Sequence, residues 1–293
     1  MLFVQLLVNG IFAGSIYALL GLSFATIFAT TKIWHFAQGA VYTLGAYAIL
    51  AASLYGKLPF AVAAGLGVAA ATLLGVLSIT ALYRPLQRRG ASSLVMVMAS
   101  LGVMVIADNL IVLGFGPTGY SIDVSVPATI SFGPVLLTGG QMVAPVTAAI
   151  VVALYLWFLF RSIHGRRMRA LIDNEELLLL NGVDTGRLKM LAFALGSALL
   201  PCAAALSIVS GAGISPYFGI QAVLTGAMAM FFGGVDSIEG AALAGLALGV
   251  IESLAAYALP TEWQTAVTYA AVLLFLMVRP TGLFGRSLPK TSL

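Results

Sequence analysis

Nine long apolar runs divide this sequence, and they constrain its fold more than any other feature. A membrane-spanning helix needs about 20 consecutive apolar residues. The chain is 61% hydrophobic and only 8% charged, whereas a soluble domain carries about 25% charge. We therefore expect an all-α, polytopic transmembrane bundle of eight to nine spans, of which the seventh run is short and broken or re-entrant. The runs are Leu2–Ala29, Ile33–Leu54, Phe60–Tyr83, Leu94–Phe115, Gln141–Phe160, Met190–Val209, Tyr217–Phe232, Ile238–Leu259 and Trp263–Val278.

The runs and the polar stretches between them predict one transmembrane domain over residues 1–293. Its parts follow the chain in order. They are a first half (1–115), an external loop (116–140), a linking span (141–160), a cytoplasmic loop (161–189), a second half (190–279) and a cytoplasmic tail (280–293).

The basic residues predict the orientation. Twelve of the 14 Lys and Arg lie in three segments, 84–89, 161–189 and 279–290. Loops rich in Lys and Arg stay in the cytoplasm. Nine spans with the N-terminus outside and the C-terminus inside put all three segments in the cytoplasm, whereas eight spans from the same start put the tail outside.

The two halves resemble each other weakly. Residues 34–45, WHFAQGAVYTLG, align with residues 216–226, PYFGIQAVLTG. Each copy follows a long span and opens a shorter, glycine-rich helix, and in the nine-span arrangement the two copies have opposite orientations. Inverted repeats with interrupted helices are typical of transporters, whose pathway lies near the repeat interface.

Polar side chains inside apolar runs are costly and need a reason. The candidates for a translocation pathway are His35, Gln38, Asp108 and Glu252. Each also has a purely structural interpretation, as a buried polar group bonded to a neighbouring helix. Two histidines in the whole chain predict no metal site, and one cysteine, Cys202, predicts no disulfide.

Small and helix-breaking residues predict where helices start and pack. Small residues spaced by four let helices approach closely. Asp236 with Glu239 is a capping-box pattern that would start a helix at Ile238, and Ser215 can cap the helix before it, with Pro216 in the first turn. The expected helix-break and packing residues are Gly39, Pro216, Gly233, Gly234, Gly245 and Gly249.

The charged middle, residues 161–189, predicts a contact with a soluble partner. Arg169 to Leu180 favours a helix that Asn181-Gly182 ends. Four leucines at 177–180 would lie on this helix outside the bilayer, where exposed apolar side chains mark a docking site. The alternative is a solvated loop with an amphipathic helix on the membrane surface.

The sequence contains no phosphate-binding loop, no H-E-x-x-H and no G-x-S-x-G motif. We therefore expect a transport protein that is not an enzyme. Its basic charges lie at the ends of apolar runs, so no nucleic-acid partner is predicted. A stand-alone secondary transporter that uses Glu252 or Asp108 as a proton site remains the alternative.

The chain resembles the LivH-type permease of branched-chain amino acid ABC importers, a type also seen in urea importers. Six segments carry the resemblance in order. They are NGIFAGSIYAL (9–19), HFAQG with GAY (35–39 and 45–47), RA with Glu176 and GVD (169–184), GGVDSIEG (233–240), GVIES (249–253) and RPTGLFG (279–285).

The resemblance implies a permease in the inner membrane of a bacterium that moves a small solute from periplasm to cytoplasm. It implies a second, LivM-like permease, two ATPases that hold ATP and Mg on their own chains, and a periplasmic solute-binding protein. No cofactor is implied on this chain. The residues that would couple to the ATPases are Arg169, Ala170, Glu175, Glu176, Leu177, Leu178, Gly182 and Asp184.

The chain departs from the family pattern at several positions. His35 and Gln38 stand where the family has Asn and His, and Leu177 and Leu178 stand where it has two alanines. The changes along the expected path leave the substrate open, and the leucines suggest a groove fitted to this system's own ATPase.

Overall fold

The computed structural model describes residues 2–122, 124, 130–132, 135–257 and 259–285, and within these the chain is almost entirely helical. Every one of the nine apolar runs forms a helix. The helices are α1 (Leu2–Thr31), α2 (Gln38–Leu54), α3 (Phe60–Leu77), α4 (Arg84–Arg88), α5 (Ser93–Phe115), α6 (Gly139–Arg161), α7 (Ile163–Asp173), α8 (Glu175–Leu180), α9 (Thr185–Val209), α10 (Phe218–Gly233), α11 (Ile238–Ala255) and α12 (Thr261–Val278), with a π-helical turn, η1 (Ser78–Tyr83), between α3 and α4.

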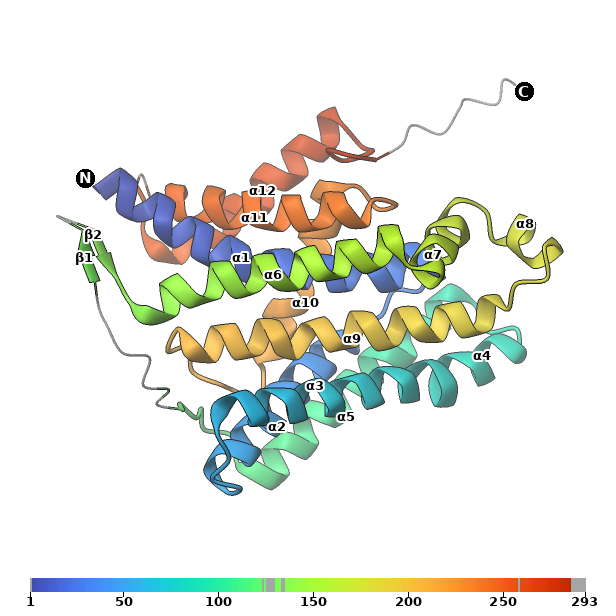
Figure 1. Cartoon of the computed structure of the whole chain (residues 1–293), viewed down its shortest axis with the longest axis horizontal. Coiled ribbons are helices and arrows are strands. Elements are labelled where there is room, and N and C mark those ends of the chain that lie inside the picture. The colour runs from blue at the N-terminus through green and yellow to red at the C-terminus, as the bar shows by residue number, and fades with distance from the viewer. Residues whose placement is uncertain (1, 123, 125–129, 133–134, 258, 286–293) are drawn as a thin grey trace.

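Two ends of the molecule are easily told apart in Figure 1. A short antiparallel hairpin, β1 (Ile130–Phe132) with β2 (Val135–Leu137), lies at one end, near the N-terminus. The α7–α8 segment projects at the other end. We call these the hairpin end and the α8 end. Of the external loop expected over 116–140, residues 123, 125–129 and 133–134 lie outside the described residues.

Six helical segments of the described chain are long and apolar enough to cross a membrane: α1, α3 continued to Arg88, α5, α6, α9 and α11. The apolar helices α2 and α10, and the apolar part of α12, are shorter. The short seventh run was expected from the sequence, but the equally short α2 was not. The apolar run that contains α2 begins at Ile33, but the helix itself begins only at Gln38, so α2 is shorter than its run.

Two helices, α1 and α9, form the centre of the bundle. A helix that is hydrophobic all round is buried against protein or lipid. Within its most apolar window, α1 is 72% buried and α9 is 67% buried. By contrast α3, α5 and α6 leave large apolar side chains such as Leu73, Leu113 and Trp157 on the surface, as expected for helices that face lipid.

The packing around α1 and α9 is mirrored between the halves. Helix α1 packs against α10 and α11, and α9 packs against α2 and α3. Likewise α2 contacts α3 and α5, as α10 contacts α11 and α12. Each central helix thus lies against the helices of the other half. This swapped arrangement supports the inverted repeat that the sequence indicates.

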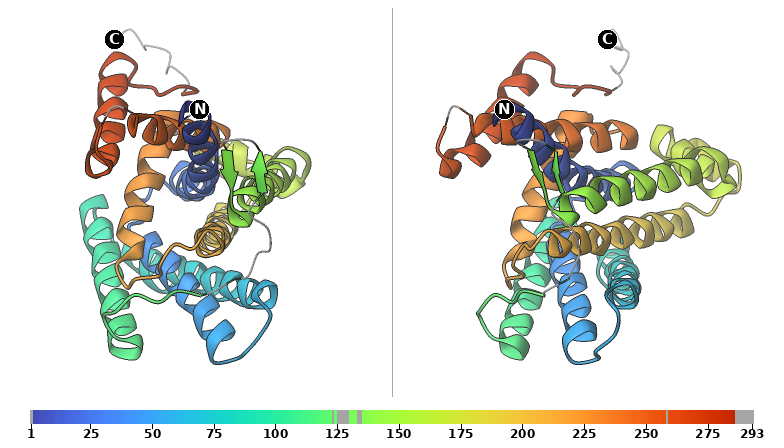
Figure 2. Two further views of the ribbon diagram at one scale, coloured as in Figure 1. Left: turned by 90° about the vertical axis from the view of Figure 1, so that its left-hand side faces the viewer. Right: turned by 60° about the vertical axis from the view of Figure 1, so that its left-hand side comes forward.

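The two short helices α2 and α10 meet at their N-terminal ends. A Cβ added at Gly219 would clash with the backbone of Gly39, and one added at Gly39 would lie 3.0 Å from the carbonyl oxygen of Gly219. Figure 2 shows α10 lying across the long axis of the bundle. The segments before α2 and α10 enter the bundle without helical structure, so both are interrupted helices of the kind that transporters use.

Close approach explains the other small residues. Gly245 lies against the backbone of Tyr17 and Gly249 against that of Gly14, which joins α11 to α1. Gly233 lies against Gly240, and Gly234 (φ 111°) against Gly282 and Gly285. The chain after α12 is held here by bonds from the Leu283 and Phe284 amides to the carbonyls of Phe232 and Gly233.

Two expected helix caps are wrong. Ser237, not Asp236, caps α11 and accepts from the amide of Gly240. Helix α10 begins at Phe218 after Tyr217, without a side-chain cap, so Ser215 and Pro216 stay outside it. In both cases a local pattern predicted the cap one or two residues too early.

Candidate functional site

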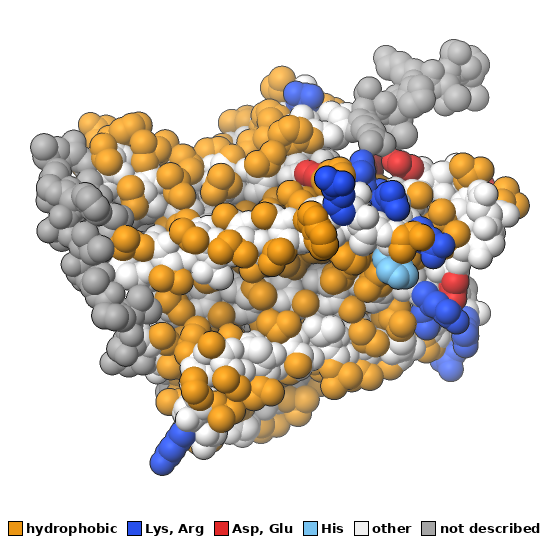
Figure 3. Space-filling model, viewed as in Figure 1, with side chains coloured by type: hydrophobic (Ala, Val, Ile, Leu, Met, Phe, Trp, Pro, Cys, Tyr) orange, Lys and Arg blue, Asp and Glu red, His pale blue; other side chains and the backbone are white. Residues whose placement is uncertain are grey.

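The α8 end gathers the positive charge of the molecule. Figure 3 shows most of the visible Lys and Arg side chains over this end, while hydrophobic side chains cover the flanks of the helices. Two of the three basic segments reach it, since η1 and α4 lead to Arg88 and Arg89 there, and the segment 161–189 runs there from the end of α6 to the start of α9. The guanidinium of Arg84 donates to the carbonyl oxygen of Gly186, 2.7 Å away, which ties the α4 segment to the start of α9.

The segment expected to contact an ATPase forms two helices instead of one. The prediction of a continuous helix over Arg169–Leu180 is wrong, because Asn174 adopts an extended conformation and ends α7. The same side chain caps α8 by accepting from the amide of Leu177. Asparagine favours such capping positions over helix interiors, so one residue both stops the first helix and starts the second.

Helix α7 is fixed to the bundle. Gly165, Met168 and Leu171 are buried against α6, α9 and α1. The Arg169 guanidinium lies 4.4 Å from the centre of the Phe160 ring, and the neighbouring Ala170 is half-buried. Because α7 is packed against the spans, it can transmit a force from α8 to them.

Helix α8 exposes its leucines. Leu177, Leu179 and Leu180 are 59%, 52% and 83% exposed, and only Leu178 packs against the bundle. One ion pair, Lys189 to Glu175 at 2.6 Å, holds the start of α8 near α9. The leucines of α8 thus form an apolar surface outside the spans, close to the Lys and Arg side chains of this end. Exposed apolar patches of this kind mark protein contacts.

The turn after α8 has a defined geometry. Gly182 adopts a positive φ of 73°, and the amides of Gly182 and Val183 donate to the carbonyls of Leu179 and Leu178. Asp184 then caps α9 by accepting from the amide of Arg187. The residues that the sequence singled out for coupling are thus brought together at one end. Glu176 is in the first turn of α8, where an acid is favourable.

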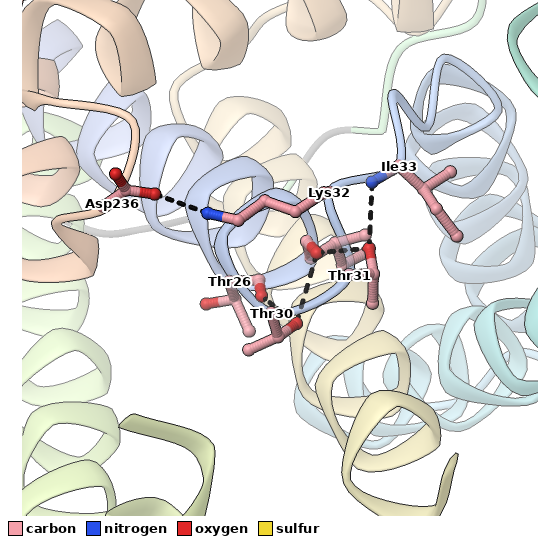
Figure 4. A network of polar contacts seen from close by, with 7 residues as sticks. Thr26, Thr30, Thr31, Lys32, Ile33 and Asp236 are labelled. Atoms are coloured by element: carbon pink, nitrogen blue, oxygen red, sulfur yellow. Dashed lines mark hydrogen bonds and ion pairs between the residues drawn. The ribbon is translucent and has the colours of Figure 1, made fainter. Parts of the chain in front are cut away.

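Figure 4 shows a second connection at this end. Lys32, just after α1, pairs with Asp236 at 2.5 Å in the turn between α10 and α11. Both side chains are about half exposed, at 55% and 50%, so the pair is worth at most about 1 kcal/mol. It connects the end of the first long span with the turn between α10 and α11 in the second half.

The expected pathway residues His35 and Gln38 are fully buried within the chain. His35 Nδ1 lies 2.8 Å from the Tyr83 hydroxyl, and its ring packs against Phe193. The Gln38 amide donates to Ser23 Oγ (2.8 Å), which donates to the carbonyl of Gly196 (2.7 Å). Together these bonds connect the start of α2 to η1, α1 and α9.

The other two pathway candidates lie apart from these. Asp108 is buried on α5, and its Oδ1 has no hydrogen-bond partner. Glu252 lies one turn before the end of α11 and accepts from Thr265 of α12 at 2.9 Å. The four residues do not form one cluster.

Tyr83 was not singled out from the sequence, yet it holds His35 in place. Replacing Tyr83 by phenylalanine leaves His35 Nδ1 buried without a partner, which costs about 1–3 kcal/mol. We expect a lower thermal unfolding midpoint in detergent for Tyr83→Phe. The exposed Tyr55→Phe is the control, and equal midpoints for both variants would show that the bond does not stabilise the fold.

The family comparisons agree with this architecture. The family model described as "Branched-chain amino acid transport system / permease component" matches residues 6–277. The high-affinity branched-chain amino acid transport system permease protein LivH of Escherichia coli K12 is 30% identical, over 97% of this chain and 96% of its own. BraD of Pseudomonas aeruginosa is 29% identical over 97% and 96%, and a probable LivH of Methanocaldococcus jannaschii is 27% identical over 96% and 92%.

The match extends through the central helices, both interrupted helices and the α7–α8 segment. The chain therefore belongs to the family of permease components of branched-chain amino acid transport systems.

Proposed function

We propose that this chain is a permease subunit of an ABC importer that carries branched-chain amino acids, or a related small solute, into the cytoplasm. The relatives named for such transport match over nearly their whole length. Two separate ATPases, each with its ATP and Mg, dock at the α8 end. A second related permease completes the pathway, and a periplasmic binding protein delivers the solute at the hairpin end.

The exposed leucines of α8 are the observation that carries this proposal. They lie on α8, which follows α7 directly. Because α7 is packed against the spans, docking at α8 can move the bundle. The positive charge at the same end supports a cytoplasmic location for it under the positive-inside rule. The N-terminus is then outside and the C-terminus inside a bacterial plasma membrane. Closure of the ATPases would switch the bundle between outward- and inward-open forms.

The test is to purify the tagged chain gently from its native membrane and identify its companions by mass spectrometry. Two ATPases and a second permease are expected, and vesicles with this complex and the binding protein should take up leucine only with ATP. A chain that purifies alone and transports without ATP would instead be a secondary transporter, with Glu252 or Asp108 as its proton site.

The turn after α8 offers a sharper check. Gly182→Ala forces a side chain into a left-handed conformation, which costs about 1–2 kcal/mol, and alters the angle at which α8 leaves the bundle. We expect less uptake per ATP hydrolysed, and the same for Glu176→Ala. Gly90→Ala is a matched control, because Gly90 has a similar φ of 70° and equal open space. Normal uptake in both the Gly182→Ala and the Glu176→Ala variant would exclude this coupling role.

A further inference from the structure

A cavity of about 260 Å³ lies between α1, α2, α9 and α10, in the half of the bundle nearer the hairpin end. Its floor is one face of α10, formed by Phe218, Gln221, Ala222 and Thr225. This i, i+3, i+4, i+7 spacing is a single stripe of a helix. The cavity therefore opens over the first two turns of an interrupted helix.

The lining is mixed but carries no formal charge. An amide comes from Gln221, and Phe12 and Leu20 are among the apolar walls. Hydroxyls come from Tyr17, Tyr42, Ser207, Ser210 and Thr225. None of the lining residues is Lys, Arg, Asp or Glu. Placing an unpaired charge in such surroundings is costly, so the cavity disfavours solutes with a net charge.

Both interrupted helices contribute to the cavity. Tyr42 of α2 and Phe218 of α10 pack with ring centres 5.0 Å apart, one turn from the point where Gly39 meets Gly219. Tyr42 also shares a hydrogen bond of 3.3 Å with Ser207 of α9. A displacement of either short helix would therefore change the shape of the cavity.

We propose that this cavity holds the solute in transit and selects small solutes without net charge, such as a zwitterionic amino acid with an apolar side chain. Hydroxyl and amide groups can bond to the polar end of such a solute, and the aromatic and leucine walls can contact its side chain. The assignment rests on the proposed importer function and adds a site of selection within the permease itself.

The first test fills the cavity. In the assembled transporter, Ala222→Trp is expected to lower ATP-dependent leucine uptake at least tenfold, while the ATPases still co-purify and hydrolyse ATP. Ala69→Trp, at an exposed position on α3, is the control. Wild-type uptake by Ala222→Trp would overturn the cavity assignment and leave the importer function intact. If the wild-type complex takes up no branched-chain amino acid, the proposed function itself fails.

The second test does not depend on a bulky side chain. In a Cys202→Ala background, Gln221→Cys is treated with a small, charged thiol reagent applied from the binding-protein side. We expect labelling to block uptake, and leucine delivered by the binding protein to slow labelling severalfold. Lysine or glutamate at the same concentration should not protect. Labelling that leaves uptake unchanged, or equal protection by charged amino acids, would contradict the proposal.

Discussion

Replacing Leu177 and Leu180 together by glutamate is expected to abolish ATP-dependent uptake. The two side chains lie one turn apart on α8 and are 59% and 83% exposed. Burying a leucine in a partner contributes about 1.5–3 kcal/mol, so losing two weakens docking by about 3–6 kcal/mol. That is a factor of at least about 100 in affinity, before the cost of burying carboxylates is added.

The measurement is uptake in vesicles together with the amount of ATPase that co-purifies. Both should fall in the double variant, while the permease itself stays folded, because α8 contributes no buried side chain among its residues. Ile163→Glu is the control, since Ile163 is 53% exposed on α7 but lies outside α8. Full uptake by the double variant would show that α8 is not where the ATPase docks.

Features that depend on local pattern were predicted well from the sequence. Each apolar run forms a helix because it is long enough, and α10 was expected to be short because glycines bound its run. The weak repeat between 34–45 and 216–226 corresponds to the two interrupted helices that meet at Gly39 and Gly219. The exposure of the leucines in α8 followed from their position outside the apolar runs.

Features that depend on contacts distant in sequence were missed. Asp236 looked like a helix cap, but Lys32, 204 residues away, pairs with it, and Ser237 caps the helix instead. Nothing near His35 in the sequence points to Tyr83, whose hydroxyl it contacts. The break at Asn174 was missed because most residues of Arg169–Leu180 favour a helix, and propensity is a weak guide where a cap competes with it.

The four candidate pathway residues also separate what local pattern predicts from what distant contacts determine. Composition identified His35, Gln38, Asp108 and Glu252 as costly polar groups in apolar runs. Their roles depend on partners from other helices, which no local pattern contains. The cavity over α10 is lined mainly by hydroxyl and apolar side chains, which are common in membrane helices and carry no motif. It becomes recognisable only when four helices are assembled around it.

The helix contact between α1 and α11 is expected to be the most sensitive to a single methyl group. A Cβ at Gly249 would overlap the backbone of Gly14, and a Cβ at Gly14 would overlap the backbone of Leu246. Backbone atoms cannot rotate away as a side chain can, so the two helices must separate along this contact. We expect Gly249→Ala to destabilise the fold by about 3 kcal/mol, the upper part of the range for overpacked cores.

Thermal unfolding in detergent and the yield of monodisperse protein measure this effect. Gly65→Ala on α3 is the matched control, because a Cβ there meets no atom within 4 Å. In a helix interior alanine is favoured over glycine by about 1 kcal/mol, so the control should be neutral or slightly more stable. Opposite signs for the same substitution would show that close packing of α1 against α11 requires glycine at 249. Equal effects would mean that the helices tolerate a wider separation, and that the small-residue stripe does not determine how the two halves pack together.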